Sequence, residues 1–340
     1  MIFRFAVSIG AGCAAAFLFA VSAQTSPLAM LLAYLAPLPV MIATMGWGVD
    51  AGAVAAATSV VGLTLLADPF SSPPYAVMTG LLFAASVAAP AWLLAAFAAA
   101  PAERYLPARI RPGESHAPVG AIVTLASVIG MLGAAATLTA LIVIYGGYAE
   151  GAKRAAAAIA ALARDAFESA DRAEAQGFAE TLVRFGPAAI AASTLLMLSV
   201  NLYAAARSTQ LSHRLSRTWP DLPTALRLPW PLGVVLIVCA AGAYLLPVPA
   251  SQYFSIGVGG LGAAFALQGL AVAHALSRGP KPNALTRLLR SVMLALLYFC
   301  SFALAKYTLP ALAALGLVDA FARLRARAAF LPSPKPTSQR

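Results

Sequence analysis

Charged residues are scarce in this chain of 340 residues. Asp, Glu, Lys and Arg together make up 10% of the sequence, while hydrophobic residues make up 61%. An ordinary soluble domain contains about 25% charged residues. The shortage of charge therefore excludes an ordinary soluble domain and indicates a protein that lies in lipid.

Cysteine and histidine are also rare, with three of each. Cys13, Cys239 and Cys300 each lie within an apolar run, and neither they nor the histidines show the spacing of a disulfide framework or a metal site. No pair of carboxylates shares a helix face in a way that suggests acid–base catalysis. We therefore expect no cofactor and no enzymatic activity.

Long runs of Ala, Leu, Val and Ile fill most of the chain. Because lipid offers no partners for free backbone groups, such runs predict helices, and their lack of alternation argues against a barrel. We expect an all-α, polytopic transmembrane bundle of about nine spans plus a short terminal helix. The expected spans are 5–21, 27–45, 48–67, 76–100, 119–145, 187–206, 231–246, 254–276 and 288–305, followed by a turn at Lys306–Pro310 and a returning helix at 311–322.

The first run has a second interpretation. Val21-Ser22-Ala23 resembles a signal-peptidase site, so a cleaved signal peptide is the alternative to an uncleaved span. We favour the span, because the run is long enough to cross a membrane and another span follows at once.

The domain organisation follows from the distribution of charge. Residues 1–147 form a five-span region, 186–322 a second membrane region, and 323–340 a basic disordered tail. Segment 148–185 is extramembrane and holds half of the chain's acids, and apolar residues at helical spacing predict two short amphipathic helices there. It is either a solvated segment resting on the membrane surface or a lid over a site in the bundle.

The formal net charge of +11 does not indicate nucleic-acid binding, because the basic residues flank the apolar spans. Loops rich in Lys and Arg remain in the cytoplasm. This rule places the loops near 104–111, 207–227 and 278–290 inside and segment 148–185 outside. We expect a multi-pass protein of the bacterial inner membrane with a cytoplasmic N-terminus.

Glycines recur in Gly257-Val258-Gly259-Gly260-Leu261-Gly262, which matches the dinucleotide-binding string GxGxxG. That motif requires a strand before it and a helix after it, whereas this string lies inside an apolar span. We interpret these glycines as points where neighbouring helices approach closely.

Polar residues and helix breakers near membrane depth are the candidate functional residues. Ionisable groups there often mark ion or substrate paths, although they also serve as interhelical hydrogen-bonding groups or lie at the interface. The candidates for a ligand or ion path are Pro37, Pro39, Asp50, Asn201, Gln268, Lys306 and Asp319.

Several short stretches resemble the YybS-like family of predicted bacterial membrane proteins of unknown function. They are Leu35-Ala36-Pro37-Leu38-Pro39 with Gly46-Trp47-Gly48, Leu226-Arg227-Leu228-Pro229, Leu267-Gln268-Gly269-Leu270, and Leu315-Gly316-Leu317-Val318-Asp319 with Arg323. That family is distantly similar to the S-components of energy-coupling-factor transporters. The resemblance implies a small-molecule pocket between helices that opens outward, and a cytoplasmic face that docks a partner.

Two functions follow as expectations. The first is a transport-related protein that holds a small-molecule or lipid-like ligand near Pro37, Asp50 and Gln268, gated by segment 148–185. The second is a membrane scaffold for an envelope or cell-division complex, with no ligand. The expected partners are the lipid bilayer, a small-molecule ligand in the first case and a membrane or cytoplasmic protein in the second, with no nucleic acid in either.

Overall fold

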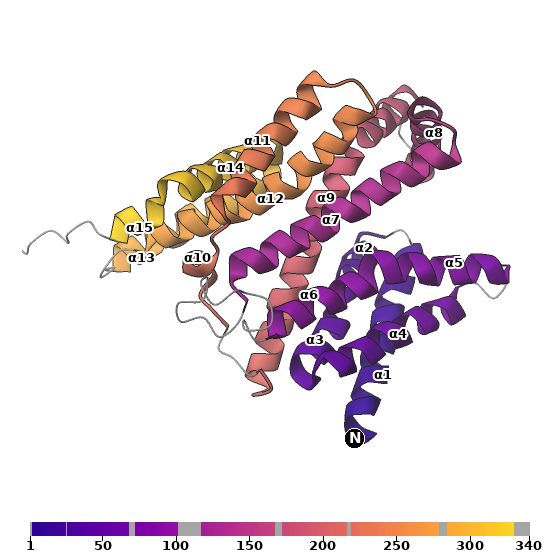
Figure 1. Cartoon of the computed structure of the whole chain (residues 1–340), viewed down its shortest axis with the longest axis horizontal. Coiled ribbons are helices and arrows are strands. Elements are labelled where there is room, and N and C mark those ends of the chain that lie inside the picture. The colour runs from indigo at the N-terminus through magenta and orange to yellow at the C-terminus, as the bar shows by residue number, and fades with distance from the viewer. Residues whose placement is uncertain are drawn as a thin grey trace, which may run out of the picture.

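The computed structural model describes residues 2–24, 26–67, 72–100, 117–166, 172–215, 219–278 and 284–329. Every regular element within these ranges is a helix, which confirms the expected all-α fold. Figure 1 shows the N-terminal helices on one side of the molecule, the C-terminal helices on the other and the long helix α9 between them.

The helices of the N-terminal part are interrupted by two short stretches of other helix types. In order, the elements are α1 (Ile2–Ala20), the 3-10 turn η1 (Val21–Gln24), α2 (Pro27–Tyr34), α3 (Pro37–Trp47), α4 (Val49–Leu66), α5 (Pro73–Phe83), the π-helical turn η2 (Ala84–Ala88) and α6 (Ala89–Ala99). The later helices are α7 (Val119–Ile144), α8 (Tyr148–Ala166), α9 (Arg172–Leu211), α10 (Leu222–Ala225), α11 (Trp230–Leu245), α12 (Ala250–Ser277), α13 (Ala284–Ala303), α14 (Ala305–Ala322) and α15 (Leu324–Ala329).

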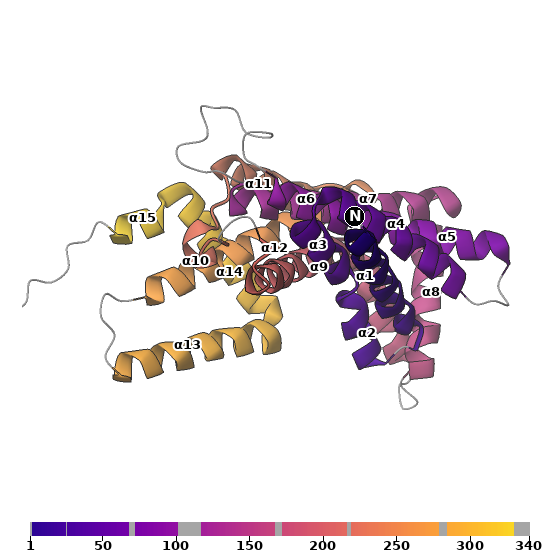
Figure 2. The ribbon, with the colours of Figure 1, turned by 90° about the horizontal axis from the view of Figure 1, so that it is seen from below.

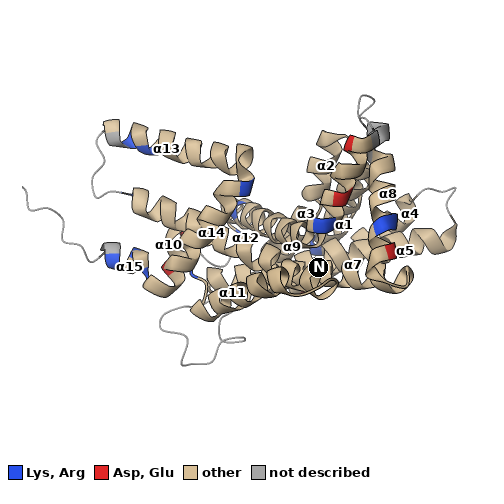
Figure 3. Ribbon diagram, turned by 90° about the horizontal axis from the view of Figure 1, so that it is seen from above, with Lys and Arg blue, Asp and Glu red and all other residues tan. Residues whose placement is uncertain are grey.

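Eight helical stretches among the described residues are long and apolar enough to cross a membrane. They are 2–23, 27–47, 49–66, 73–99, 119–144, 173–211, 250–277 and 305–322, and α11 is apolar but shorter. Figure 3 shows how little of the ribbon is charged, and many large apolar side chains are exposed. The protein is therefore a multi-pass membrane protein surrounded by lipid.

The spans differ from the expectation near the C-terminus. Helix α13 occupies the predicted ninth span, but its side chains are described without interruption only over 287–303, a stretch shorter than any of the eight, so α13 is not counted among them. Helix α14, in contrast, is long enough to count as a span, since it begins at Ala305 instead of the predicted 311.

The chain does turn back before α14, but the turn lies at Leu304 and not at Lys306–Pro310. Leu304 has non-helical backbone angles, whereas Pro310 lies inside α14. The hydroxyl of Thr308 donates to the carbonyls of Cys300 and Leu304, at 2.9 and 3.0 Å, and so joins the end of α13 to the start of α14. Figure 2 shows the resulting hairpin, in which α13 stands apart from the rest of the bundle.

The segment that the sequence predicts to be extramembrane, 148–185, forms a helical hairpin of α8 and the first part of α9. The predicted second short helix and the predicted sixth span are one helix, because Pro187 lies inside α9 and does not begin a new helix. Ala156 and Ala160 of α8 pack on Ala179 of α9. Phe178 and Phe185, apolar residues at the helical spacing that predicts this amphipathic helix, are more than half exposed.

Helices α9 and α12 form the centre of the fold. Helix α9 contacts α3, α6, α7, α8 and α12, while α12 contacts α7, α9, α11 and α14. A Cβ added at Gly257, Gly259 or Gly260 would clash with Cys239, Ala188 or Met131 of neighbouring helices. The prediction that this string serves helix packing is therefore confirmed for these glycines, whereas Gly262 faces open space.

Some expected features lie outside the described residues. These are the basic loop 104–111, Glu168 and Asp171 of the extramembrane segment, and the tail beyond Ala329. The first part of the expected tail is the short helix α15.

Candidate functional site

Gln268 lies in the middle of a buried polar cluster on α12. Its side chain is 1% exposed. The amide oxygen Oε1 accepts a hydrogen bond from the backbone N–H of Leu228 at 2.7 Å, while Nε2 donates to the Gly316 carbonyl at 3.1 Å and to Asp319 Oδ2 at 2.9 Å. Gln268 therefore links the loop before α11 to α14.

Asp319 forms an ion pair with Arg325. Arg325 Nη2 lies 2.7 Å from Asp319 Oδ2, and both side chains are only 5% exposed. The same guanidinium donates to the carbonyls of Pro223 and Leu226, at 2.7 and 2.6 Å. Asp319 neutralises its charge, and the four hydrogen bonds to Asp319, Pro223 and Leu226 use four of its five N–H donors.

The backbone conformation at Arg323 reverses the chain and so brings Arg325 back to Asp319. Arg323 ends α14 in the left-handed conformation with φ of 52°, and its N–H donates to the Asp319 carbonyl at 2.8 Å. The chain then reverses, and the Arg325 N–H donates to Asp319 Oδ1 at 3.2 Å. The backbone groups of Leu226 and Leu228 are available because the chain leaves α10 in an extended conformation, where backbone groups need partners outside a helix. The Pro223 carbonyl belongs to the single turn of α10 itself.

In this cluster the side chains of Gln268, Asp319 and Arg325 bond to one another and to backbone groups of residues 223–228. Buried polar groups are stable when each has a partner, and these groups use one another. The geometry favours an interhelical role for Gln268 and Asp319 over contact with a ligand.

A second group of candidates surrounds the break between α2 and α3. Pro37 and Pro39 lie in the first turn of α3, where backbone N–H groups lack helical partners and proline is tolerated. The break frees the Tyr34 carbonyl, and Asn201 Nδ2 of α9 donates to it at 2.7 Å and to the Met197 carbonyl at 2.8 Å. Asn201 thus fixes this break against α9.

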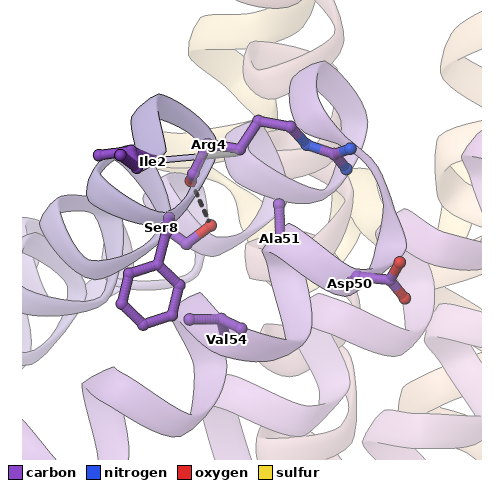
Figure 4. A pocket seen from close by; sticks show the side chains of 7 residues that line it. Ile2, Arg4, Ser8, Asp50, Ala51 and Val54 are labelled. Atoms are coloured by element: carbon purple, nitrogen blue, oxygen red, sulfur yellow. Dashed lines mark hydrogen bonds between the residues drawn. The ribbon is translucent and has the colours of Figure 1, made fainter.

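Asp50 lies elsewhere, in the first turn of α4, where a negative charge complements the helix dipole. It lines an open groove of about 470 Å³ between α1 and α4. Figure 4 shows Asp50 and Arg4 at the same end of this groove. Arg4 donates to the Trp47 carbonyl, and the guanidinium of Arg214 lies 4.6 Å from the Trp47 ring.

Lys306 is separated from the other candidates. It lies at the start of α14 with its ammonium 4.8 Å from the Tyr307 ring. Asp319 lies near the other end of the same helix, about 20 Å away at 1.5 Å per residue. The structure thus brings Gln268 together with Asp319, and Pro37 with Asn201, but it does not gather Pro37, Asp50 and Gln268 into one site.

Two apolar cavities lie beside the central helix α12. One, of about 630 Å³, is bounded by α9, α11, α12, α13 and α14, and the other, of about 450 Å³, by α7, α9, α10, α12 and α13. They adjoin, because both are lined by Leu196, Leu267, Leu270 and Tyr298. Small residues of α12, among them Gly262 and Ala266, leave the larger cavity unfilled.

Tyr298 of α13 stands between the two cavities. Its hydroxyl lies 2.9 Å from Nε2 of His274 on α12, and the two rings are 5.7 Å apart. Apart from this contact, α13 packs mainly on α14. A single loosely held helix therefore covers one side of both cavities.

An ion pair lies near the same end of α12 as His274. Arg278 donates to both carboxylate oxygens of Asp221, at 2.6 and 2.9 Å. The hydrogen bond from Arg278 lowers the pKa of Asp221 below its ordinary value, with a further contribution from Thr224, although burial acts in the opposite direction. The pair ties the loop before α10 to the end of α12.

The sequence profile of the family described as "Predicted membrane protein (DUF2232)" matches residues 13–320. The chain belongs to this family. No curated protein and no solved structure matches it.

The match covers nearly all of the helices that line the apolar cavities, but it stops at residue 320. Arg325, beyond that point, is the polar residue that sequence reasoning missed, since it was assigned to the basic tail. Its partner Asp319 is six residues away, which is not a spacing that brings side chains together on a helix. His274 and Tyr298 were missed as a pair as well, because nothing in the sequence connects two polar residues on separate helices.

Proposed function

We propose that this DUF2232 protein is a transport-related protein of the bacterial inner membrane, with its N-terminus in the cytoplasm, and that it holds a lipid-like ligand in the two apolar cavities beside α12. The observation that carries this proposal is that the cavities adjoin at Leu267, Leu270 and Tyr298. The proposal includes no catalytic step.

The lining of the cavities determines the class of ligand. The larger cavity is lined almost entirely by Ala, Gly, Leu, Val, Ile and Pro side chains, with Tyr298 and Ser301 as the exceptions. Such a surface offers an acyl or isoprenoid chain good van der Waals contact and gives a polar solute few partners. Lipid is also the solvent around these helices, so it has direct access.

Helix α13 is the proposed gate. It is held at one end by the turn to α14 and, in the same half of the helix, by the His274–Tyr298 contact. Arg287 and Arg290 lie near its other end, where they suit an anionic headgroup. Movement of α13 away from α12 would open the cavities to the bilayer.

The resemblance of short stretches of this chain to the YybS-like family, which is distantly similar to transporter S-components, supports a transport role over other roles for such a ligand. The alternative, a membrane scaffold, is supported by Phe178, Leu182 and Phe185, which form an exposed apolar face on the extramembrane part of α9. Exposed apolar faces of this kind are typical of contact with a protein or the membrane surface.

Gly262→Phe tests the ligand site. Gly262 lines the larger cavity and has no neighbouring atom within 4 Å of an added Cβ, so a phenyl ring fills the cavity without breaking a helix contact. Gly133→Phe is the matched control, because Gly133 of α7 also faces open space but lines neither cavity. Lipid retained by each purified protein is measured by native mass spectrometry.

We expect the parent and Gly133→Phe to retain lipid and Gly262→Phe to lose most of it. Equal retention by Gly262→Phe and the parent would rule out the cavity as the ligand site. Retention of a stoichiometric protein partner together with an empty cavity would favour the scaffold.

A further inference from the structure

A third cavity lies outside the apolar part of the bundle, between the α8–α9 hairpin and the start of α12. Its volume is about 520 Å³, a size typical of sites for small molecules. Polar side chains distinguish it from the two cavities beside α12. It is lined by Tyr148, Ala152, Lys153, Ala156, Gln176, Glu180, Val183, Arg184, Val248 and Gln252.

The charges on the wall of this cavity favour an anion. Lys153 and Arg184 contribute two positive charges and Glu180 one negative charge. The Glu180 carboxylate already accepts a hydrogen bond from Gln176 Nε2 at 3.0 Å. The neighbouring pair Glu150 and Arg154, whose atoms are 2.8 Å apart, does not line the cavity.

Gln252 supplies an independent sign of a ligand. Its side chain is 8% exposed, and among the described residues no group donates a hydrogen bond to its buried oxygen Oε1. A buried acceptor without a partner is unfavourable. A bound molecule with an O–H or N–H group would provide the missing donor.

Tyr148 adds a hydrogen-bond donor to the lining of the same cavity. Burial raises the pKa of its phenol, and the nearby positive charge of Arg184 only partly opposes this effect. The phenol is therefore protonated at neutral pH, and its O–H can donate to an anionic oxygen.

We propose that this cavity binds a small anion that also carries a hydrogen-bond donor, such as a hydroxylated phosphate monoester. The anionic oxygens contact Lys153, Arg184 and the Tyr148 hydroxyl, and the donor of the ligand contacts Gln252 Oε1. The α8–α9 hairpin covers the bound molecule. The site is separate from the apolar cavities and does not depend on lipid binding there.

Isothermal titration calorimetry on the purified full-length chain in detergent tests the proposal with three probes. Glycerol 3-phosphate carries both an anionic group and hydroxyl donors, sulfate carries the charge without a donor, and glycerol carries donors without charge. We expect glycerol 3-phosphate to bind more tightly than sulfate and glycerol not to bind at the same concentrations.

Variants identify the residues involved. Lys153→Gln should raise the Kd for glycerol 3-phosphate roughly ten-fold, since it removes a charge-assisted contact. Arg154→Gln is the matched control, because it removes the same charge from the adjacent position outside the cavity. Gln252→Met keeps the size of the side chain but removes the acceptor, so it should bring the affinity for glycerol 3-phosphate close to that for sulfate.

Two outcomes would overturn the proposal: none of the anions binds, or Lys153→Gln and Arg154→Gln weaken binding equally. Gly262→Phe should leave anion binding unchanged, so failure of the lipid site and failure of this site are distinguishable.

Discussion

Asp319 lies near the end of a membrane-spanning helix and is nearly as buried as the apolar residues around it. It accepts hydrogen bonds from Gln268, from the Arg325 backbone and from the Arg325 guanidinium. Burying either charge alone carries a large unfavourable desolvation free energy, and the close, hydrogen-bonded geometry of the pair offsets it. The stability of this end of the molecule thus depends on both partners being present.

Arg325→Met should destabilise the protein by about 3–5 kcal/mol, because it leaves the Asp319 carboxylate buried without its counter-charge. Asp319→Leu combined with Arg325→Met should cost less than the sum of the two single changes. Arg327→Met, at an exposed position of the same helix, is the control and should change stability little. Thermal unfolding in detergent gives the comparison, and additive effects of the two changes would contradict the coupling.

At the scale of elements, α12 and α14 cross closely, with a glycine of each helix at the contact. A Cβ added at Gly269 would clash with the Leu312 carbonyl, and one added at Gly316 would clash with the Phe265 carbonyl. Because neither obstacle is a flexible side chain, the helices would have to move apart. This crossing positions Asp319 beside Gln268 and defines one wall of the larger apolar cavity.

Gly269→Ala and Gly316→Ala should each destabilise the protein by about 1–3 kcal/mol through overpacking. Gly133→Ala, at a helical glycine facing open space, should be neutral or stabilise the protein by about 0.5–1 kcal/mol. Unfolding followed by circular dichroism measures these changes. If Gly269→Ala proved as harmless as Gly133→Ala, the close approach of α12 and α14 would be wrong.

At the scale of the whole molecule, the basic residues near the ends of the helices bear on the orientation in the membrane. Arg-bearing segments of α13 and α15 lie at the same end (Figure 3), and Arg4 and Arg214 both contact Trp47. The α8–α9 hairpin lies at the far end of α7 and α9 from these contacts (Figure 1). The arrangement agrees with the alternation of basic loops that the sequence predicts, and the side that faces the cytoplasm stays a prediction.

Labelling with a membrane-impermeant maleimide tests the orientation. Glu174→Cys and Ser212→Cys are introduced singly into a cysteine-free background, since both positions are exposed and lie at opposite ends of the stretch 173–211 of α9. We expect Glu174→Cys to react in intact cells and Ser212→Cys only after permeabilisation, because basic loops remain in the cytoplasm. The reverse pattern would show that the bundle is inverted.

The fold was more predictable than the sites. Apolar runs determine spans through a local requirement, which is that lipid cannot satisfy a free backbone group, so α1, α4, α7 and α12 appear where the sequence places them. The positions of helix breaks were less predictable: Pro187 and Pro310 lie inside helices, while Leu304 makes the turn. A proline removes a single backbone donor, and neighbouring contacts decide whether the helix continues.

By itself the sequence determined that the chain is a helical bundle in lipid and that the glycines near residue 259 allow close packing, because both follow from the chemistry of consecutive residues. Only the tertiary structure decided that Arg325 reaches Asp319, that Asn201 supports the break at Pro37, and that cavities remain beside α12 and under the α8–α9 hairpin. Each of these features depends on the distance between side chains on different helices or beyond a helix end, which the spacing of residues along one chain does not specify.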